Sequence, residues 1–270
     1  MKTVLLYASD DNGMESRLQV ALDVARAFES HIDCVQVTPF DAIIMGDPFG
    51  GVYALPNVVA AVQDAEDDHK ARIEQRLQNE GASWDWLRYT GQPSQVIVEC
   101  SRLVDLIVLS LPGEDGGYSG PEAIAADVAL TARAPVLAVG RETRSVNCFG
   151  PAMIAWNGSP EAANALRLTL PMLQKASAIH IVSVAEAKEG VLPPINASQY
   201  LSRHGLASEL HEWPASERSV AEALRDAAAT LGAAWVVMGV YGHSRFREAV
   251  YGGVTRDLLR HSAVPLLLAH

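Results

Sequence analysis

Cysteine is scarce in this sequence, and its few cysteines are far apart. Three are present, an odd number without a CxxC pair, so their spacing excludes a disulfide framework and a cysteine metal site. We predict that they are free thiols buried in the core. They are Cys34, Cys100 and Cys148. Four histidines also lack the spacing of metal ligands, and we predict no bound metal. They are His69, His204, His211 and His261.

Long apolar runs and basic clusters are absent as well. The first apolar run ends at the polar residues 9–11, which makes it too short for the core of a signal peptide. No stretch approaches the roughly 18 apolar residues of a membrane-spanning helix. The formal charge is −11 with scattered Lys and Arg, so the phosphate attraction that supports nucleic-acid binding has no footprint. The sequence therefore predicts a globular cytoplasmic protein whose partners include neither nucleic acid nor a membrane.

The order of segments in the first half of the chain restarts near residue 149. In the first half, an apolar run at 3–8 is followed by a polar turn, the helical pattern LQVALDVARAF and a strand-like segment at 32–37. In the second half, the run at 152–156 is followed by a turn, the pattern EAANALRLTLPML and a segment at 179–184. Self-similarity of this kind indicates a duplication. We place the two domains at 1–143 and 149–270, joined by the charged segment RETRSVNCFG.

Within each half, short apolar strands alternate with helical stretches of about 12 to 20 residues. That pattern is typical of a parallel sheet covered by helices on both faces. The sequence therefore predicts an α/β fold with two tandem five-stranded parallel sheets. The expected strands lie at 2–8, 32–38, 84–89, 105–110 and 135–140 in the first half, and at 151–156, 178–184, 207–213, 234–239 and 264–269 in the second.

The first half also carries an apolar, glycine-rich stretch that has no counterpart in the second. It reads DAIIMGDPFGGVYALPNVVAAV and lies between the second expected strand and the next helix. One interpretation is a lid or a partner-binding loop, because apolar residues beside flexible glycines invite contact. The other is a segment that packs against its own domain or against the other half.

The most informative segment follows the expected fourth strand of the second half. It reads MGVYGHSRFREAVYGGVTRDLLRH, residues 238–261, and its glycines are Gly239, Gly242, Gly252 and Gly253. Glycine between a strand and a helix permits positive φ and close approach of a ligand, and free N–H groups at a helix start attract phosphate. We therefore predict a phosphate site at the start of the helix TRDLLRH, with a threonine hydroxyl as an added donor. Its residues are Gly252, Gly253, Val254 and Thr255.

The glycine spacing G-x2-G-x9-G resembles the ATP-binding signature of the universal stress protein family. Gly239, Gly242 and Gly252 match its three glycines, whereas Gly253 stands where the family usually has Ser or Thr. This substitution removes a phosphate hydrogen bond worth roughly 1.5 to 3 kcal/mol when the partner is charged. The backbone N–H of Gly253 and the hydroxyl of Thr255 remain. The nearby side chains that offer charge are His243, Arg245 and Arg247.

The resemblance implies a Rossmann-like fold of the adenine nucleotide alpha hydrolase type, with strand order 3-2-1-4-5 in each half. In that order, the loops after strands 1 and 4 flank the topological switch point, where ligands bind. The family usually presents an Asp after strand 1 and a Val on strand 2 to the adenosine; the matching residues are Asn157 and Val184. Trp156 and Met238 lie beside the same loops. The implied ligand is ATP, with ADP or AMP as alternatives and Mg²⁺ as a companion.

The corresponding segment of the first half, LSLPGEDGGYSGPEAIAADVALTARAP, departs from the signature. Ser110 replaces the first glycine, Gly113 keeps the second, and Glu122 falls at the third, where its carboxylate repels phosphate. Alanines stand where hydroxyls are wanted, at Ala123 and Ala125. The loop at 9–12 does offer an acidic residue in the expected place. We predict a degenerate copy kept for its fold and interface, although Gly116, Gly117 and Gly120 leave open a loop for an unrelated ligand.

Other nucleotide-binding classes make demands that this sequence does not meet. It has no GxxxxGK[ST] of a P-loop NTPase, and neither ASDDNGMES nor AWNGSPEA contains the GxGxxG of a dinucleotide-binding turn. The Ser-Gly-Gly loop of an ATP pyrophosphatase is missing too. The sequence shows no set of residues with the spacing of a catalytic site. His243 could be proposed as a base near a γ-phosphate, but a single histidine in a loop is a weak candidate. We expect at most slow ATP hydrolysis.

Two functions from different classes follow from this sequence. The first is a stress-response module whose association with an unidentified protein partner depends on an adenine nucleotide in the second domain. The alternative is a tandem scaffold that binds no nucleotide and acts only through its surfaces. By resemblance, the last strands of the two halves, 136–139 and 266–269, pair within the chain as an internal pseudo-dimer. A homodimer of two chains is compatible with this arrangement.

Overall fold

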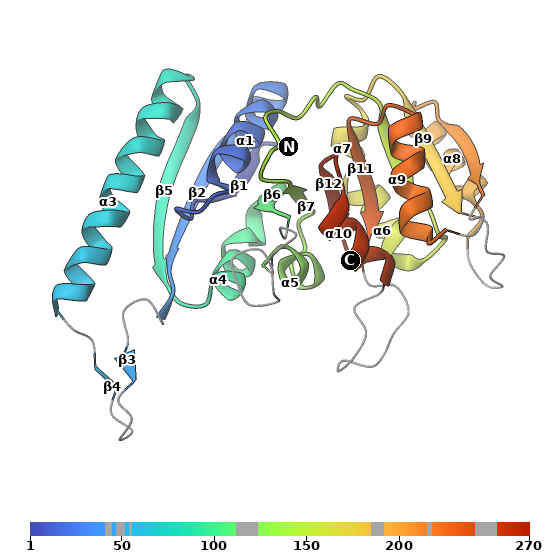
Figure 1. Cartoon of the computed structure of the whole chain (residues 1–270). Helices are drawn as coiled ribbons and strands as arrows, with labels where there is room; N and C mark the ends of the chain where they lie inside the picture. The colour runs from blue at the N-terminus through green and yellow to red at the C-terminus, as the bar shows by residue number, and fades with distance from the viewer. Residues whose placement is uncertain are drawn as a thin grey trace.

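The chain folds into a continuous ten-stranded α/β sheet (Figure 1). The computed structural model describes residues 1–40, 45–46, 52–53, 56–111, 124–184, 192–214, 218–240 and 253–270. The first half contributes the strands β1 (Thr3–Tyr7), β2 (His31–Thr38), β5 (Ser83–Thr90), β6 (Leu106–Ser110) and β7 (Val136–Val139). The second half contributes β8 (Ala152–Ala155), β9 (Ile179–Val184), β10 (Glu209–Trp213), β11 (Trp235–Gly239) and β12 (Leu266–Ala269).

The predicted strand order is confirmed in each half. Across the sheet the order is β10-β9-β8-β11-β12-β7-β6-β1-β2-β5, which is 3-2-1-4-5 when the strands of each half are numbered separately. All neighbours within a half are parallel. Because both faces of a parallel sheet are covered, its central strands are continuous apolar runs. β6 is an example, since all of its residues are buried.

The two predicted five-stranded sheets are present, and they are joined edge to edge into one sheet. β12 pairs antiparallel with β7, with Leu267 opposite Leu137. The pairing of the last strands that the resemblance implied therefore occurs, and the halves are related as in a pseudo-dimer. Both last strands therefore lie inside the sheet, and its free edges are β5 and β10.

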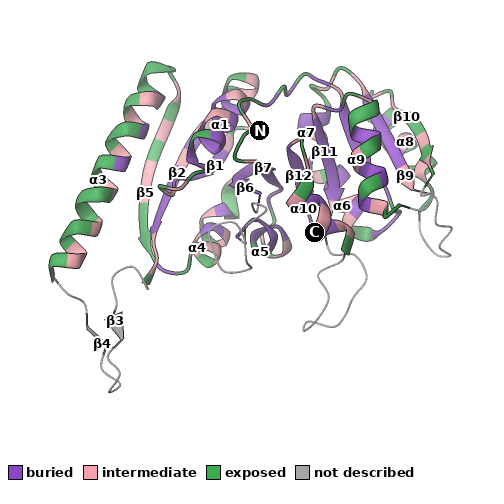
Figure 2. Cartoon of the chain, viewed as in Figure 1, coloured by how far each residue is buried: buried purple, intermediate pink, exposed green. Residues whose placement is uncertain are grey.

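Two layers of helices cover the sheet (Figure 2). The core on one face takes its helical side chains from α1 (Met14–Phe28), α3 (Pro56–Asn79), α6 (Pro160–Leu168), α7 (Leu170–Leu173) and α8 (Pro194–Arg203). The core on the other face takes them from α4 (Pro93–Cys100), α5 (Ile124–Thr131), α9 (Val220–Thr230) and α10 (Gly253–His261). A short 3-10 turn, η1 (Ser101–Leu103), follows α4. Within the described ranges, no helix is both long and apolar enough to cross a membrane.

The extra stretch of the first half lies largely outside the described residues. Its described part includes two short antiparallel strands, β3 (Met45–Gly46) and β4 (Val52–Tyr53), which form a separate two-stranded sheet. Neither interpretation of this stretch is therefore tested.

The cysteines are all free thiols, as predicted, but only two of them are buried. Cys34 and Cys148 are buried, whereas Cys100 is half-buried. Burial raises the pKa of the Cys34 thiol to about 12 and that of Cys148 to about 11, since a thiolate in an apolar environment loses its hydration. The segment that contains Cys148 lies against α1, because the backbone N–H of Val146 donates to Asp23 Oδ2 at 2.9 Å.

Candidate functional site

The switch point of the second half lies where the chain leaves β8 and β11. β8 and β11 are adjacent and parallel, with Met238 opposite Ala155, so their carboxyl ends meet at the same edge of the sheet. The turn after β8 is closed by Asn157, whose Oδ1 accepts a hydrogen bond from the Ser159 N–H at 3.1 Å. Ser159 then caps α6 by accepting from the N–H of Ala162 at 3.2 Å. Asn157 itself remains exposed at the surface of this edge.

Gly239 has a clear physical role at this edge. A Cβ at this position would lie 2.5 Å from both the nitrogen of Ala162 and the carbonyl carbon of Glu161. Because these are backbone atoms that a side chain cannot push aside, only glycine lets the end of β11 touch the first turn of α6. The glycine predicted from the motif is therefore required for packing, and it draws the loops after strands 1 and 4 together.

The helix that follows the glycine-rich segment begins at Gly253. Gly253 is exposed, and a Cβ added there would meet no atom of the described residues within 4 Å. Val254 is half-buried, and Thr255 is only 6% exposed. Among the described residues, the first turn of α10 thus combines the backbone N–H groups of a helix start with a buried hydroxyl, an arrangement that favours an anion.

The other predicted site residues are distributed as follows. Trp156 and Met238 are buried at neighbouring strand ends, and Val184 is half-buried at the end of β9. The indole N–H of Trp156 donates to the carbonyl of Leu192 at 2.9 Å, so it already has a partner within the chain. Several positions named above lie outside the described residues. In the second half they are Gly242, His243, Arg245, Arg247 and Gly252, and in the first half they are Gly113, Gly116, Gly117, Gly120, Glu122 and Ala123.

The switch point of the first half is filled by a buried arginine that sequence reasoning missed. Arg17 of α1 is 1% exposed, and its guanidinium forms a bidentate ion pair with Asp11, both N···O distances being 2.9 Å. The same guanidinium donates to Ser110 Oγ at 2.6 Å, and to the carbonyls of Tyr7 and Ser9 at 2.9 and 3.0 Å. It therefore ties the loop after β1 to the end of β6, across the place where a ligand of this fold would enter.

The two halves achieve the close contact at their switch points in opposite ways. In the first half, the strand end carries a serine, and the helix start carries the glycine. A Cβ at Gly13 would lie 2.3 Å from Ser110 Oγ. In the second half, the strand end carries Gly239, and the helix start carries ordinary side chains. The serine at 110 is thus part of the Arg17 network and does not line an open crevice.

Both acidic residues of the loop after β1 are engaged within the chain. Asp11 pairs with Arg17, and Asp10 lies 3.1 Å from a guanidinium nitrogen of Arg72 and 3.3 Å from Nδ1 of His69. His69 is 2% exposed, and within the described residues its Nε2 has no hydrogen-bond partner. Burial lowers the pKa of His69, because an imidazolium would lose its hydration. The acidic residue expected for a nucleotide contact in this half is therefore occupied by side chains of the protein.

The fold is a tandem of two α/β units. The switch point of the first unit is occupied by the Arg17 side chain, and that of the second carries Gly239. Residues 149–270 match the Universal stress protein family. The C-terminal half of the chain therefore belongs to the universal stress protein family, and the N-terminal half repeats the same fold. No curated protein sequence matches the chain.

Solved structures support the tandem organisation. A universal stress protein from Archaeoglobus fulgidus superimposes with a TM-score of 0.78 at 15% identity, over 99% of this chain and 97% of that chain. A putative universal stress protein from Pseudomonas aeruginosa superimposes with a TM-score of 0.59 at 16% identity, over 100% of this chain and 93% of that chain. At these identities the likeness concerns the fold, and it extends over both halves.

Proposed function

We propose that this protein binds an adenine nucleotide at the switch point of its C-terminal half, and that occupancy governs its association with a protein partner. ATP is the expected ligand, with ADP or AMP as alternatives. The observation that carries the proposal is the contrast between the halves. The first switch point is filled by Arg17, whereas the second brings a glycine and an open helix start to the same place in the fold.

No arginine of α6 repeats the role of Arg17. The only arginine of that helix, Arg167, is exposed, and the buried face of α6 is made of Ala162, Ala165 and Leu166. The switch point of the second half therefore contains no buried arginine from α6 in the place that Arg17 occupies in the first half. This difference supports a division of labour, in which the first half stabilises the pseudo-dimer and the second binds the ligand.

The described residues fit a nucleotide at two points. The phosphates would be held at the start of α10, by the N–H groups near Gly253 and by the Thr255 hydroxyl. A bound phosphate gains there from the helix dipole, and Gly253 places no side chain in its way. The adenosine would lie toward the ends of β8 and β9, near Asn157 and Val184. A nucleotide with its Mg²⁺ supplies a phosphate-rich anion whose charge these groups recognise.

A second function is supported for the first half alone. Its switch point is closed by Arg17, Asp11 and Ser110, and its last strand forms the join with the second half. This half would therefore act as a scaffold that presents a surface to a partner, whatever the ligand state of the other half.

The nucleotide proposal is tested by titrating the purified chain with ATP and Mg²⁺ in a calorimeter. We expect one nucleotide per chain. Gly253→Glu should bind at least about tenfold more weakly, because its carboxylate repels phosphate at the same N–H groups. The unliganded fold tolerates this change, since the Cβ is unobstructed and a carboxylate favours a helix N-terminus.

The matched control is Gln199→Glu, which adds the same charge at an exposed position of α8. It should bind ATP as the wild type does. Absence of binding at millimolar ATP in every variant would refute the nucleotide proposal and leave the scaffold. Amide hydrogen exchange with and without ATP tests whether nucleotide occupancy changes the surface that a partner would bind. Protection confined to the residues that contact ATP would contradict this part of the proposal.

A further inference from the structure

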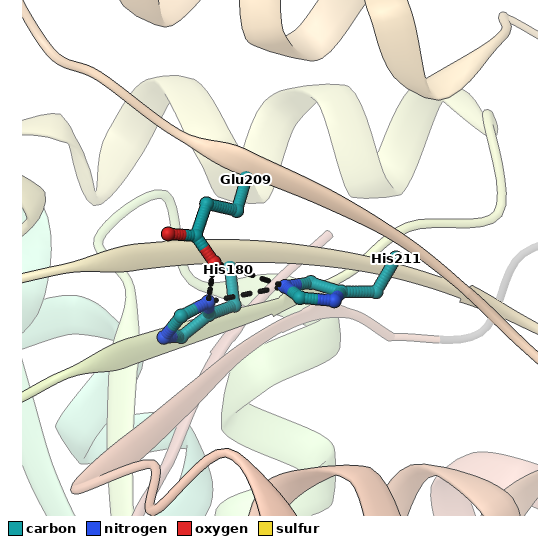
Figure 3. A group of neighbouring side chains, drawn as sticks. All are labelled: His180, Glu209 and His211. Carbon is teal, nitrogen blue, oxygen red and sulfur yellow. Dashed lines mark hydrogen bonds and ion pairs between the residues drawn. The ribbon is translucent and has the colours of Figure 1, made fainter.

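Two histidines and a glutamate meet at one edge of the sheet, far from each other in the sequence. His180 lies near the start of β9, and Glu209 and His211 lie on β10, the edge strand of the second half. Glu209 is directly opposite His180 in the parallel register, and His211 is two residues further along the same strand. The three side chains converge on one point (Figure 3). Since His180 is near the amino end of β9, this cluster lies at the opposite end of the strands from the switch point.

The distances between the three donor atoms are close to those of a tetrahedral zinc site. His180 Nδ1 is 3.1 Å from His211 Nε2. Glu209 Oε2 is 3.4 Å from the former nitrogen and 3.6 Å from the latter. Zinc bonds to His nitrogen and carboxylate oxygen of about 2.0–2.2 Å place two ligands of a tetrahedron about 3.3–3.5 Å apart. One of the three separations falls within this range and the other two lie close to it, so small side-chain adjustments would place the atoms at three corners of one tetrahedron.

The two imidazoles of the cluster are partly buried, and its carboxylate is exposed. The His180 side chain is 11% exposed, that of His211 is 24% exposed, and that of Glu209 is 72% exposed. The two ring nitrogens that face each other at 3.1 Å either share the ring proton of one neutral imidazole in a hydrogen bond or bind a common metal ion, because two lone pairs would repel. The exposed carboxylate closes the third side. The fourth coordination position opens to solvent at the sheet edge.

We propose that His180, Glu209 and His211 form a Zn²⁺ site that is independent of the nucleotide. Two imidazole nitrogens and one carboxylate suit zinc and its neighbours among the divalent transition metals, whereas Mg²⁺ and Ca²⁺ prefer sites made of oxygen alone. Three protein ligands and one open position are the composition of a zinc site that retains a water or accepts a ligand from outside.

The first half provides an internal comparison at the corresponding strands. On β2 and β5, His31 Nε2 lies 3.2 Å from Asp85 Oδ2 and 3.6 Å from Asp33 Oδ1. The directly paired residues are Asp33 and Asp85 here and His180 and Glu209 in the second half. This cluster has one imidazole, and the other ring nitrogen of His31 is 2.7 Å from Ser83 Oγ. With a single nitrogen ligand, it is the poorer transition-metal site.

The test is a calorimetric titration of the chelator-treated full chain with Zn²⁺ at pH 7.5. We expect one ion per chain in the wild type. Glu209→Gln and His211→Ala should each weaken binding by at least about 100-fold, because loss of a direct ligand exceeds the usual effect of its outer-sphere partners. His31→Ala and His204→Ala are the matched controls, since one lies in the cluster of the first half and the other is an exposed histidine outside both clusters. Both should bind as the wild type does.

Glu209→Gln keeps the test independent of folding, because the side chain is exposed and its replacement has the same shape. Imidazole nitrogen chemical shifts provide a second readout, and Zn²⁺ should move those of His180 and His211 alone. Equal Zn²⁺ affinity of wild type and Glu209→Gln would overturn the proposal, as would the absence of binding at 100-fold excess of Zn²⁺ over about 1 µM protein. One ion per two chains would also contradict a site that is complete within one chain.

Discussion

Restoring the missing hydroxyl at residue 253 should strengthen nucleotide binding. Gly253 begins α10, where a Cβ would meet no atom of the described residues within 4 Å, and its φ is not in the left-handed region. Gly253→Ser therefore adds a hydroxyl at the helix start without a steric cost. A hydrogen bond to a charged phosphate is worth roughly 1.5 to 3 kcal/mol, so the Kd for ATP should fall roughly 10- to 150-fold.

Gly253→Ala separates the hydroxyl from the effect on the backbone. Both substitutions restrict the unfolded chain and should raise the free energy of unfolding by about 0.4–1 kcal/mol. Only the serine can donate to phosphate, so only it should tighten binding when the three proteins are compared by calorimetry under one Mg²⁺ concentration. If serine and alanine bind ATP equally well, the phosphates do not lie at the start of α10, and the reasoning is refuted.

Three further predictions concern the stability and reactivity of the described residues. Arg17→Met should lower the free energy of unfolding in urea by about 3 kcal/mol, because it leaves the partly buried Asp11 unpaired. The control Arg26→Met removes an exposed ion pair and should lower it by less than about 1 kcal/mol. Equal losses in the two variants would contradict the buried network. Burial lowers the pKa of His69, so the unfolded state binds the proton more tightly; stability should be full above the ordinary His pKa of about 6.5 and fall as the pH drops below it. His69→Gln should flatten that slope in urea titrations at several pH values, and an unchanged slope would mean that other groups cause it. In thiol labelling of the native protein, Cys100 should react first. Cys34 and Cys148 should react only in denaturant, since burial protects both thiols and raises their pKa. Early labelling of Cys34 would contradict a closed core.

The strands and their order could be predicted because each is a short apolar run in a repeated pattern. The expected strand at 105–110 is found as β6 at Leu106–Ser110, and the one at 178–184 as β9 at Ile179–Val184. The join between the two sheets, the antiparallel pairing of β7 with β12, was expected only from the family resemblance and not from the apolar pattern. Apolar pattern identifies a strand, but it does not say whether the edge of that strand meets another sheet.

The clusters of side chains could not be predicted, because they depend on contacts between distant segments. The Arg17 network joins Asp11, Arg17 and Ser110 from three parts of the chain. A signal was present, since Arg17 is three residues after Met14 on the buried face of α1, and a buried cation needs a partner. The spacing of the histidines in the sequence does not indicate the proposed metal site, because only the register of β9 and β10 brings His180 close to His211.

The central claim is that this chain holds an adenine nucleotide in its C-terminal half. The most direct test is mass spectrometry of the ligand released on denaturing protein that was purified without added nucleotide, with Gly252→Glu as the comparison. The account predicts one ATP, ADP or AMP per chain from the wild type and none from the variant. Release of no nucleotide from the wild type, together with no binding when millimolar ATP is added back, would contradict the account.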